Sequence, residues 1–130
     1  MTDQKPAPVY NLEERTLAFA KRTRTLVKII SKTISNIEDS RQLVRSSGSI
    51  GANYIEANES LGKKDFLMRL RISRKEAKES RFFLNLIDVG RENETERMAL
   101  IQESTELMNI FGAIIRKSEV SYVKEPETEY

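Results

Sequence analysis

The stretch that decides the fold runs from residue 63 to residue 87 and reads KKDFLMRLRISRKEAKESRFFLNLI. Apolar and small residues recur in it at alternating steps of four and three, without a break. This row consists of Phe66, Leu70, Ser73, Ala77, Ser80, Leu84 and Ile87. Because such steps return to the same side of an α-helix, the row predicts an amphipathic helix that buries this side. The helix is expected to end at Val89-Gly90.

Three further helices are predicted on either side of this segment. All three prolines lie near the termini, so the interior of the chain is free to be helical. Capping boxes at Asn11-x-x-Glu14 and Asn93-x-x-Glu96 predict the starts of the first and fourth helices. The expected helices span residues 11–33, 37–61 and 93–123 besides the one described above, with a turn at Ser35-Asn36 and with Ile34 and Leu61 facing inward.

Four amphipathic helices with short connections predict an all-α protein, an antiparallel up-down-up-down four-helix bundle. The bundle domain is expected at residues 11–123, between a flexible N-terminal tail at 1–10 and a flexible acidic C-terminal tail at 124–130. No signal peptide and no membrane-spanning run is evident, so a cytoplasmic protein without membrane contact is expected.

The composition excludes several kinds of functional site. The chain has 130 residues, a length typical of one domain, and contains no cysteine, histidine or tryptophan. Thiol nucleophiles, imidazole bases and Cys/His metal ligands are therefore missing. The remaining carboxylates, lysines, tyrosines and serines form no recognisable catalytic arrangement. We expect no enzymatic activity, no cofactor and no bound metal.

The net charge of +2 conceals an uneven distribution. Residues 15–81 carry 16 Lys+Arg against 7 Asp+Glu, a net charge of +9, and the remainder carries −7. Part of this excess is a row of cations on one flank of the 63–87 segment, which we call the basic row. It consists of Arg71, Arg74, Lys78 and Arg81, with Lys75 beside it and Lys63 and Lys64 before it. Such a row suits contact with nucleic-acid phosphates, although an ordinary solvated helix face carries similar charges.

Two glycines interrupt the expected second helix, in the segment Ser46-Ser47-Gly48-Ser49-Ile50-Gly51-Ala52-Asn53. Each glycine costs roughly 1 kcal/mol of helix stability relative to alanine. One explanation is a glycine-rich phosphate loop, but the Walker spacing and a preceding strand are missing. The favoured explanation is close packing of two helices, with Ser73, Ala77 and Ser80 as the small residues opposite.

Carboxylate pairs occur at positions 56/59 and 76/79. Di-iron bundles combine such carboxylates with histidines, which the chain lacks. Glu76 and Glu79 lie one position ahead of the apolar row, so they are expected to be half-buried and to need partners. We predict Arg45 and Asn53 as those partners, in a structural rather than a catalytic network.

The fourth helix carries two adjacent apolar rows. They are Leu100, Leu107 and Ile114, and then Ile101, Met108 and Ile115, with Phe111 beside them. Such a wide apolar face is explained either by a broad stripe facing the core or by burial against a second copy of the chain.

Motifs in the second and third helices resemble those of the bacterial four-helix-bundle family of 23S rRNA intervening-sequence proteins. They are Gln42-Leu43-Val44-Arg45-Ser46, Ser49-Ile50-Gly51-Ala52-Asn53, Glu56-Ala57, Lys64-Asp65-Phe66 and Lys75-Glu76-Ala77-Lys78-Glu79-Ser80. Their order and spacing match the family over about half the chain. In one departure, Phe82-Phe83-Leu84 stands where family members often carry Tyr-Trp-Leu, which preserves the aromatic character.

The resemblance implies a bundle that assembles into a ring-like homopentamer. Residues of packing or assembly would then be Arg45, Ser49, Gly51, Asn53, Glu56, Glu76 and Glu79. A related family, the accessory variability proteins of diversity-generating retroelements, binds nucleic acid through a basic surface and associates with a reverse transcriptase. We therefore expect a non-enzymatic homo-oligomer that binds RNA or DNA through the basic row and its neighbouring lysines. The alternative is a protein-binding scaffold, for example an accessory partner of a reverse transcriptase.

Overall fold

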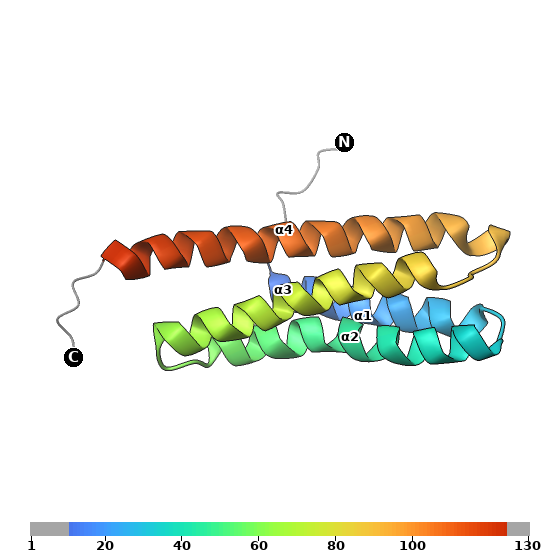
Figure 1. Ribbon diagram of the computed structural model, residues 1–130, viewed down its shortest axis with the longest axis horizontal. Coiled ribbons are helices and arrows are strands. Elements are labelled where there is room, and N and C mark those ends of the chain that lie inside the picture. Colours follow the sequence, from blue (N-terminus) through green and yellow to red (C-terminus); the bar gives the residue numbers. More distant parts are fainter. Residues whose placement is uncertain (1–10, 125–130) are drawn as a thin grey trace, which may run out of the picture.

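The computed structural model describes residues 11–124, which form four long helices packed side by side (Figure 1). They are α1 (Leu12–Ile29), α2 (Ile34–Asn58), α3 (Lys63–Leu86) and α4 (Glu94–Lys124), with the short 3₁₀ helix η1 (Arg91–Asn93) before α4. Successive helices run in opposite directions, which confirms the predicted all-α, up-down-up-down bundle. The N-terminal tail predicted at residues 1–10 and all but the first residue of the C-terminal tail predicted at 124–130 lie outside the described residues, and Lys124 is the last residue of α4.

The core lies along the predicted apolar row of α3. Every member of this row is buried except Phe66, which is partly buried and packs against the core. On α4, Leu100, Leu107 and Phe111 are fully buried, and the neighbouring Ile101 and Met108 pack against the same core. A broad core-facing stripe therefore accounts for both apolar rows of α4 within a single chain.

The connection between α1 and α2 lies earlier than predicted. Helix α1 ends at Ile29, and α2 starts at Ile34 after its N-cap Thr33, whose side chain accepts a hydrogen bond from the Asn36 N–H at 3.1 Å. The predicted turn at Ser35-Asn36 is therefore wrong, because both residues belong to the first turn of α2. Ile34, expected to face inward, is 83% exposed.

The end of α2 was also placed too late. The helix stops at Asn58, and the backbone N–H of Glu59 closes its last turn on the carbonyls of Glu56 and Ala57. Leu61, predicted on the inward face, lies in the connection to α3 and is fully exposed.

The capping prediction is right for α1 and wrong for α4. The Asn11 side chain accepts the N–H of Glu14 at 3.1 Å, as the first capping box requires. Asn93 instead lies inside η1 and donates its side-chain amide to the carbonyl of Val89, while the Glu96 carboxylate binds Arg22. The chain enters η1 through Gly90, whose φ of 82° favours glycine.

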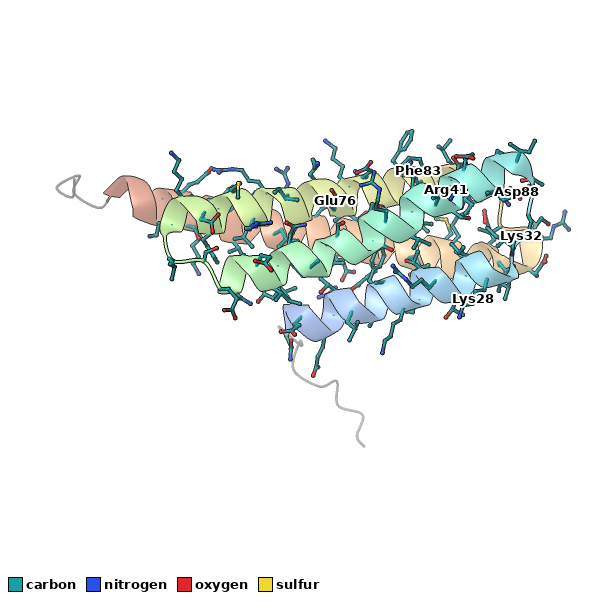
Figure 2. The ribbon with its side chains drawn as sticks, turned by 90° about the horizontal axis from the view of Figure 1, so that it is seen from below. Lys28, Lys32, Arg41, Glu76, Phe83 and Asp88 are labelled. Carbon is teal, nitrogen blue, oxygen red and sulfur yellow. The ribbon has the colours of Figure 1, made fainter. Side chains whose placement is uncertain are left out.

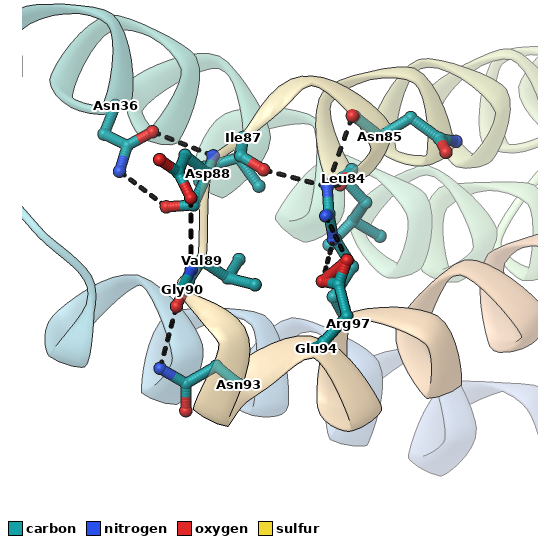
Figure 3. Close-up of polar contacts among 10 residues, drawn as sticks. All are labelled: Asn36, Leu84, Asn85, Ile87, Asp88, Val89, Gly90, Asn93, Glu94 and Arg97. Atoms are coloured by element: carbon teal, nitrogen blue, oxygen red, sulfur yellow. Dashed lines mark hydrogen bonds and ion pairs between the residues drawn. The ribbon is translucent and has the colours of Figure 1, made fainter.

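Polar contacts fix the end of the bundle where α2, α3 and α4 meet (Figure 3). The buried Asn36 side chain accepts the Asp88 N–H at 3.0 Å and donates to the Asp88 carbonyl at 2.8 Å. Across the same turn, Arg97 donates to the carbonyls of Leu84, Asn85 and Ile87, at 3.1, 3.3 and 2.9 Å. These side chains therefore supply partners to backbone groups that the end of α3 leaves unpaired.

None of the helices within residues 11–124 is long and apolar enough to cross a membrane.

Candidate nucleic-acid interface

The glycines of α2 bring it close to α1. The segment from Ser46 to Asn53 lies within a continuous helix, so it is not a phosphate-binding loop. A Cβ atom added at Gly51 would lie 2.6 Å from Thr16 Oγ1 and 3.1 Å from Thr16 Cβ, closer than packed atoms approach. Close helix packing is therefore the role of Gly51, but its neighbour is α1 and not α3 as predicted.

Serines, rather than glycines, form the contact between α2 and α3. The hydroxyls of Ser46 and Ser80 are 2.8 Å apart and share a hydrogen bond in the interior. The Ser73 hydroxyl donates to the carbonyl of Ile50 at 2.9 Å. These small side chains satisfy one another's polar groups where the two helices touch, and so they fix the rotation of α3 about its axis. That rotation decides which α3 side chains reach solvent.

The basic row lies on the flank of α3 that faces α4. Arg71 forms an ion pair with Glu119 of α4, and Arg81 donates to the Thr105 hydroxyl at 3.2 Å. Both ends of the row are thus tied to α4. In the middle of the row, Arg74 and Lys78 are exposed and form no hydrogen bond or ion pair with any described residue.

The lysines beside the row differ in their surroundings. Lys63 and Lys64 are the first two residues of α3, and Lys64 is exposed whereas Lys63 is partly buried. The Lys75 ammonium lies 3.6 Å from Glu76 Oε2 with 67% of its side chain exposed. The exposed cations Arg74, Lys75 and Lys78 therefore lie together in the middle of α3.

Ion pairs between α1 and α4 neutralise part of the charge asymmetry seen in the sequence. Arg15 contacts Glu103 and Glu106 at 2.6 Å each, and the hydrogen bond that it donates to Glu103 is the main reason that the pKa of the Arg15 guanidinium is raised. Arg22 binds both oxygens of Glu96 at 3.0 Å. Arg15 and Arg22 of α1 are thus paired with carboxylates of α4. Exposed cations remain on α3 and, separately, near the α1–α2 connection, where Lys28, Lys32 and Arg41 lie (Figure 2).

Glu76 is buried in the middle of α3 (Figure 2), and neither predicted partner forms a hydrogen bond with it, although the charge of Arg45 acts on its carboxylate. Asn53 accepts a hydrogen bond from Arg69 at 3.0 Å, and Arg45 donates to Gln42 at 3.2 Å. Glu76 Oε2 faces Lys75, while Oε1 is buried with no hydrogen-bond partner among the described residues. Burial, and next the charge of Glu79, raise the pKa of the Glu76 carboxyl above its ordinary value.

The raised pKa predicts how pH affects stability. The folded state binds the Glu76 proton more tightly than the unfolded chain does, so stability falls as pH rises from the ordinary glutamate pKa through the raised one. We expect Glu76→Gln to raise the free energy of unfolding at pH 8 by about 1 kcal/mol and to have a smaller effect at pH 4.5, where more of the folded wild-type carboxyl is protonated. Urea unfolding at both pH values measures this difference. The exposed Glu56→Gln is the control, and an equal effect of both substitutions would contradict the prediction.

The remaining assembly residues taken from the resemblance lie on α2, except Glu79, which lies on α3. The Asn53 side chain donates to the Ser49 carbonyl at 3.0 Å and accepts a hydrogen bond from Arg69, so it links α2 to α3. Glu56 is exposed, and Glu79 is partly buried on the neighbouring side of α3. The structure therefore gives Asn53 and Gly51 a role in helix packing within a single chain.

One basic residue beside the row was missed by the sequence reasoning. Arg116 of α4 folds back over Gly112, and the guanidinium of Arg74 also lies next to this glycine. The sequence contains one signal for this arrangement, a glycine four residues before an arginine. Because glycine has no side chain, the arginine one turn later can fold back over it. No group of three or more His, Cys, Asp and Glu side chains within residues 11–124 is placed to hold a metal ion.

The fold and this surface define a class of protein, the all-α four-helix bundle with a strip of cations along one helix. Residues 11–113 match the family of 23S rRNA-intervening sequence proteins, and the chain belongs to that family. It is also similar to a crystal structure of a protein of unknown function from the S23 ribosomal protein family of Bacteroides thetaiotaomicron. The two chains are 30% identical with a TM-score of 0.69, over 80% of this chain and 97% of the other. A comparison with curated proteins finds no significant match.

Proposed function

We propose that this protein is a non-enzymatic, homo-oligomeric bundle that binds RNA or DNA through the basic row of α3. The observation that carries the proposal is the middle of that row, where Arg74 and Lys78 have no counter-charge among the described residues. Cations held in a line along a rigid helix contact successive phosphates and release the counterions bound to them. Such contacts give affinity with little discrimination between sequences.

An exposed aromatic side chain beside the row supports binding of single strands in particular. Phe82 is 58% exposed and lines a shallow depression together with Phe83, Lys75, Lys78 and Glu79. The ring of Phe82 meets that of Phe83 edge-on, with centroids 5.3 Å apart, which supports its orientation. Aromatic rings next to cations stack unpaired bases while the cations hold the backbone.

Self-association belongs to the same proposal. The resemblance implies a homopentamer. Each subunit of the ring would present its own α3 row, so one nucleic-acid strand could contact several rows at once. A mass in solution about five times that of the 15.0 kDa chain, measured by light scattering, is the expected result. A monomer mass would contradict this part of the proposal.

Fluorescence anisotropy with labelled single-stranded RNA and DNA of arbitrary sequence tests the binding itself. We expect binding at 50 mM salt that weakens roughly 10- to 100-fold at 200 mM, the range for three or four phosphate contacts. Absence of binding at 50 mM salt would contradict the nucleic-acid role, and would favour the alternative of a scaffold for an acidic protein or a reverse transcriptase.

A matched pair of variants locates the interface. Arg74→Gln/Lys78→Gln and Lys21→Gln/Lys28→Gln remove the same charge from exposed positions, the first on α3 and the second on α1. We expect the α3 variant to weaken RNA binding at least 10-fold and to reduce the salt slope by one to two contacts. The α1 variant is expected to change affinity less than threefold. Equal losses would mean that net charge, and not the α3 surface, governs binding.

A further inference from the structure

A notch in α4 lies opposite the middle of the basic row. Gly112 is a buried glycine within α4, and the side chains of Arg74 and Arg116 cover the space next to its Cα atom. A Cβ atom placed there would lie 3.4 Å from Arg116 Nη1 and 3.7 Å from Arg74 Nε. Two guanidinium groups, one from each helix, therefore converge on a single point above the glycine.

The two arginines have no anion between them. Within residues 11–124, neither Arg74 nor Arg116 forms an ion pair or a hydrogen bond, whereas Arg71 has Glu119 as its partner. Like charges held close together repel each other, so this arrangement lacks a negative group that would make it favourable. Both side chains are exposed, and an anion from solution can therefore reach them.

The geometry points to a phosphate as that anion. A guanidinium presents several N–H donors in a planar fork, and two forks that approach from different helices can share the several oxygens of one tetrahedral anion. Lys78, one turn further along α3 and exposed, extends the positive charge and suits a second phosphate of the same chain. We propose that Arg74 and Arg116, which meet over Gly112, together bind one phosphate group on the solvent side of their guanidinium groups.

The identity of the ligand as a nucleic-acid backbone phosphate rests on the proposed function. A free phosphate or diphosphate would make the same contacts with the two arginines as a backbone phosphate. The two experiments below distinguish a nucleic acid from a free phosphate as the ligand. Arg116 would have the same role with either ligand, which is to share the phosphate with Arg74.

Binding of labelled RNA by single variants tests the site. Arg116→Gln and Lys117→Gln remove one positive charge from adjacent exposed positions of α4, and Lys117 is not among the atoms close to the notch. We expect Arg116→Gln to weaken binding five- to tenfold at 50 mM salt and to reduce the salt slope by about one contact. The loss from Lys117→Gln is expected to stay below twofold. Equal losses would contradict the phosphate site at Arg74 and Arg116, but they would not contradict the RNA-binding role.

Titration with inorganic pyrophosphate tests the site without nucleic acid. NMR signals of the arginine Nε–H groups in the full-length protein report on each guanidinium. We expect the Arg74 and Arg116 signals to move together and to saturate, and the Arg22 signal to stay in place because Glu96 occupies it. A response to pyrophosphate without RNA binding would retain the site and reject the proposed function. No selective response of Arg74 and Arg116 would overturn the site.

Discussion

Replacing Arg97 by alanine is expected to lower the free energy of unfolding by about 2–3 kcal/mol. The side chain is 19% exposed and donates to three carbonyls at the end of α3 (Figure 3). Its Nε also donates to Glu94 at 2.9 Å, and this pairing holds the pKa of the Glu94 carboxyl below its ordinary value. Alanine removes all these donors and leaves the partly buried carbonyls of Leu84 and Ile87 without them.

Urea unfolding measures the Arg97 effect against a matched arginine. Arg22 forms a two-point ion pair with Glu96, but both side chains are more than 40% exposed, so Arg22→Ala is expected to cost less than about 1 kcal/mol. Arg97→Lys should fall between the two, because an ammonium keeps the charge but reaches fewer carbonyls. If Arg97→Ala costs no more than Arg22→Ala, the carbonyl contacts do not hold the α3–α4 turn in place.

Replacing Gly51 by alanine is expected to lower the free energy of unfolding by about 1–3 kcal/mol, the usual cost of overpacking. The added Cβ would lie 2.6 Å from Thr16 Oγ1, so α1 must move away from α2. Alanine has a higher helix propensity than glycine, and a loss of stability would therefore reflect the interhelical contact and not the helix itself.

Gly48→Ala is the control on the same helix. A Cβ at Gly48 meets Arg24 Nη2 at 3.2 Å, the flexible end of a long side chain, so this substitution should be neutral or stabilising by up to about 1 kcal/mol. Thr16→Ala should reduce the cost of Gly51→Ala, because it removes the clashing hydroxyl, which hydrogen-bonds only within α1. Additive effects of the two substitutions would contradict the contact between Thr16 and Gly51.

The helices of the bundle were predictable because their apolar periodicity is local. The row from Leu70 to Ile87 identified the buried side of α3 without knowledge of any other helix. The α1–α2 connection was misplaced because, besides the local N-cap Thr33, one of its determinants is not local. Asn36 is buried against the backbone of Asp88, a residue 52 positions away, and nothing in the surrounding segment indicates that partner.

The candidate interface was predictable in composition but not in geometry. Spacing alone placed Arg71, Arg74, Lys78 and Arg81 on one flank of α3. Packing of the bundle sets where Glu119 and Thr105 lie along α4. Their positions decide which cations of the row have a partner on α4. The same packing brings Arg116 to Arg74 over Gly112.

Binding through the basic row is tested most directly by mapping bound RNA onto the protein. An NMR titration of the isotope-labelled full-length chain with a short single-stranded RNA identifies the residues whose signals change. We expect the changes to concentrate on α3 between Arg71 and Arg81 and on the facing part of α4, and to be reversed by 0.5 M salt, because screening weakens phosphate contacts. Changes confined to α1 and α2, or no changes at low salt, would contradict this role for α3.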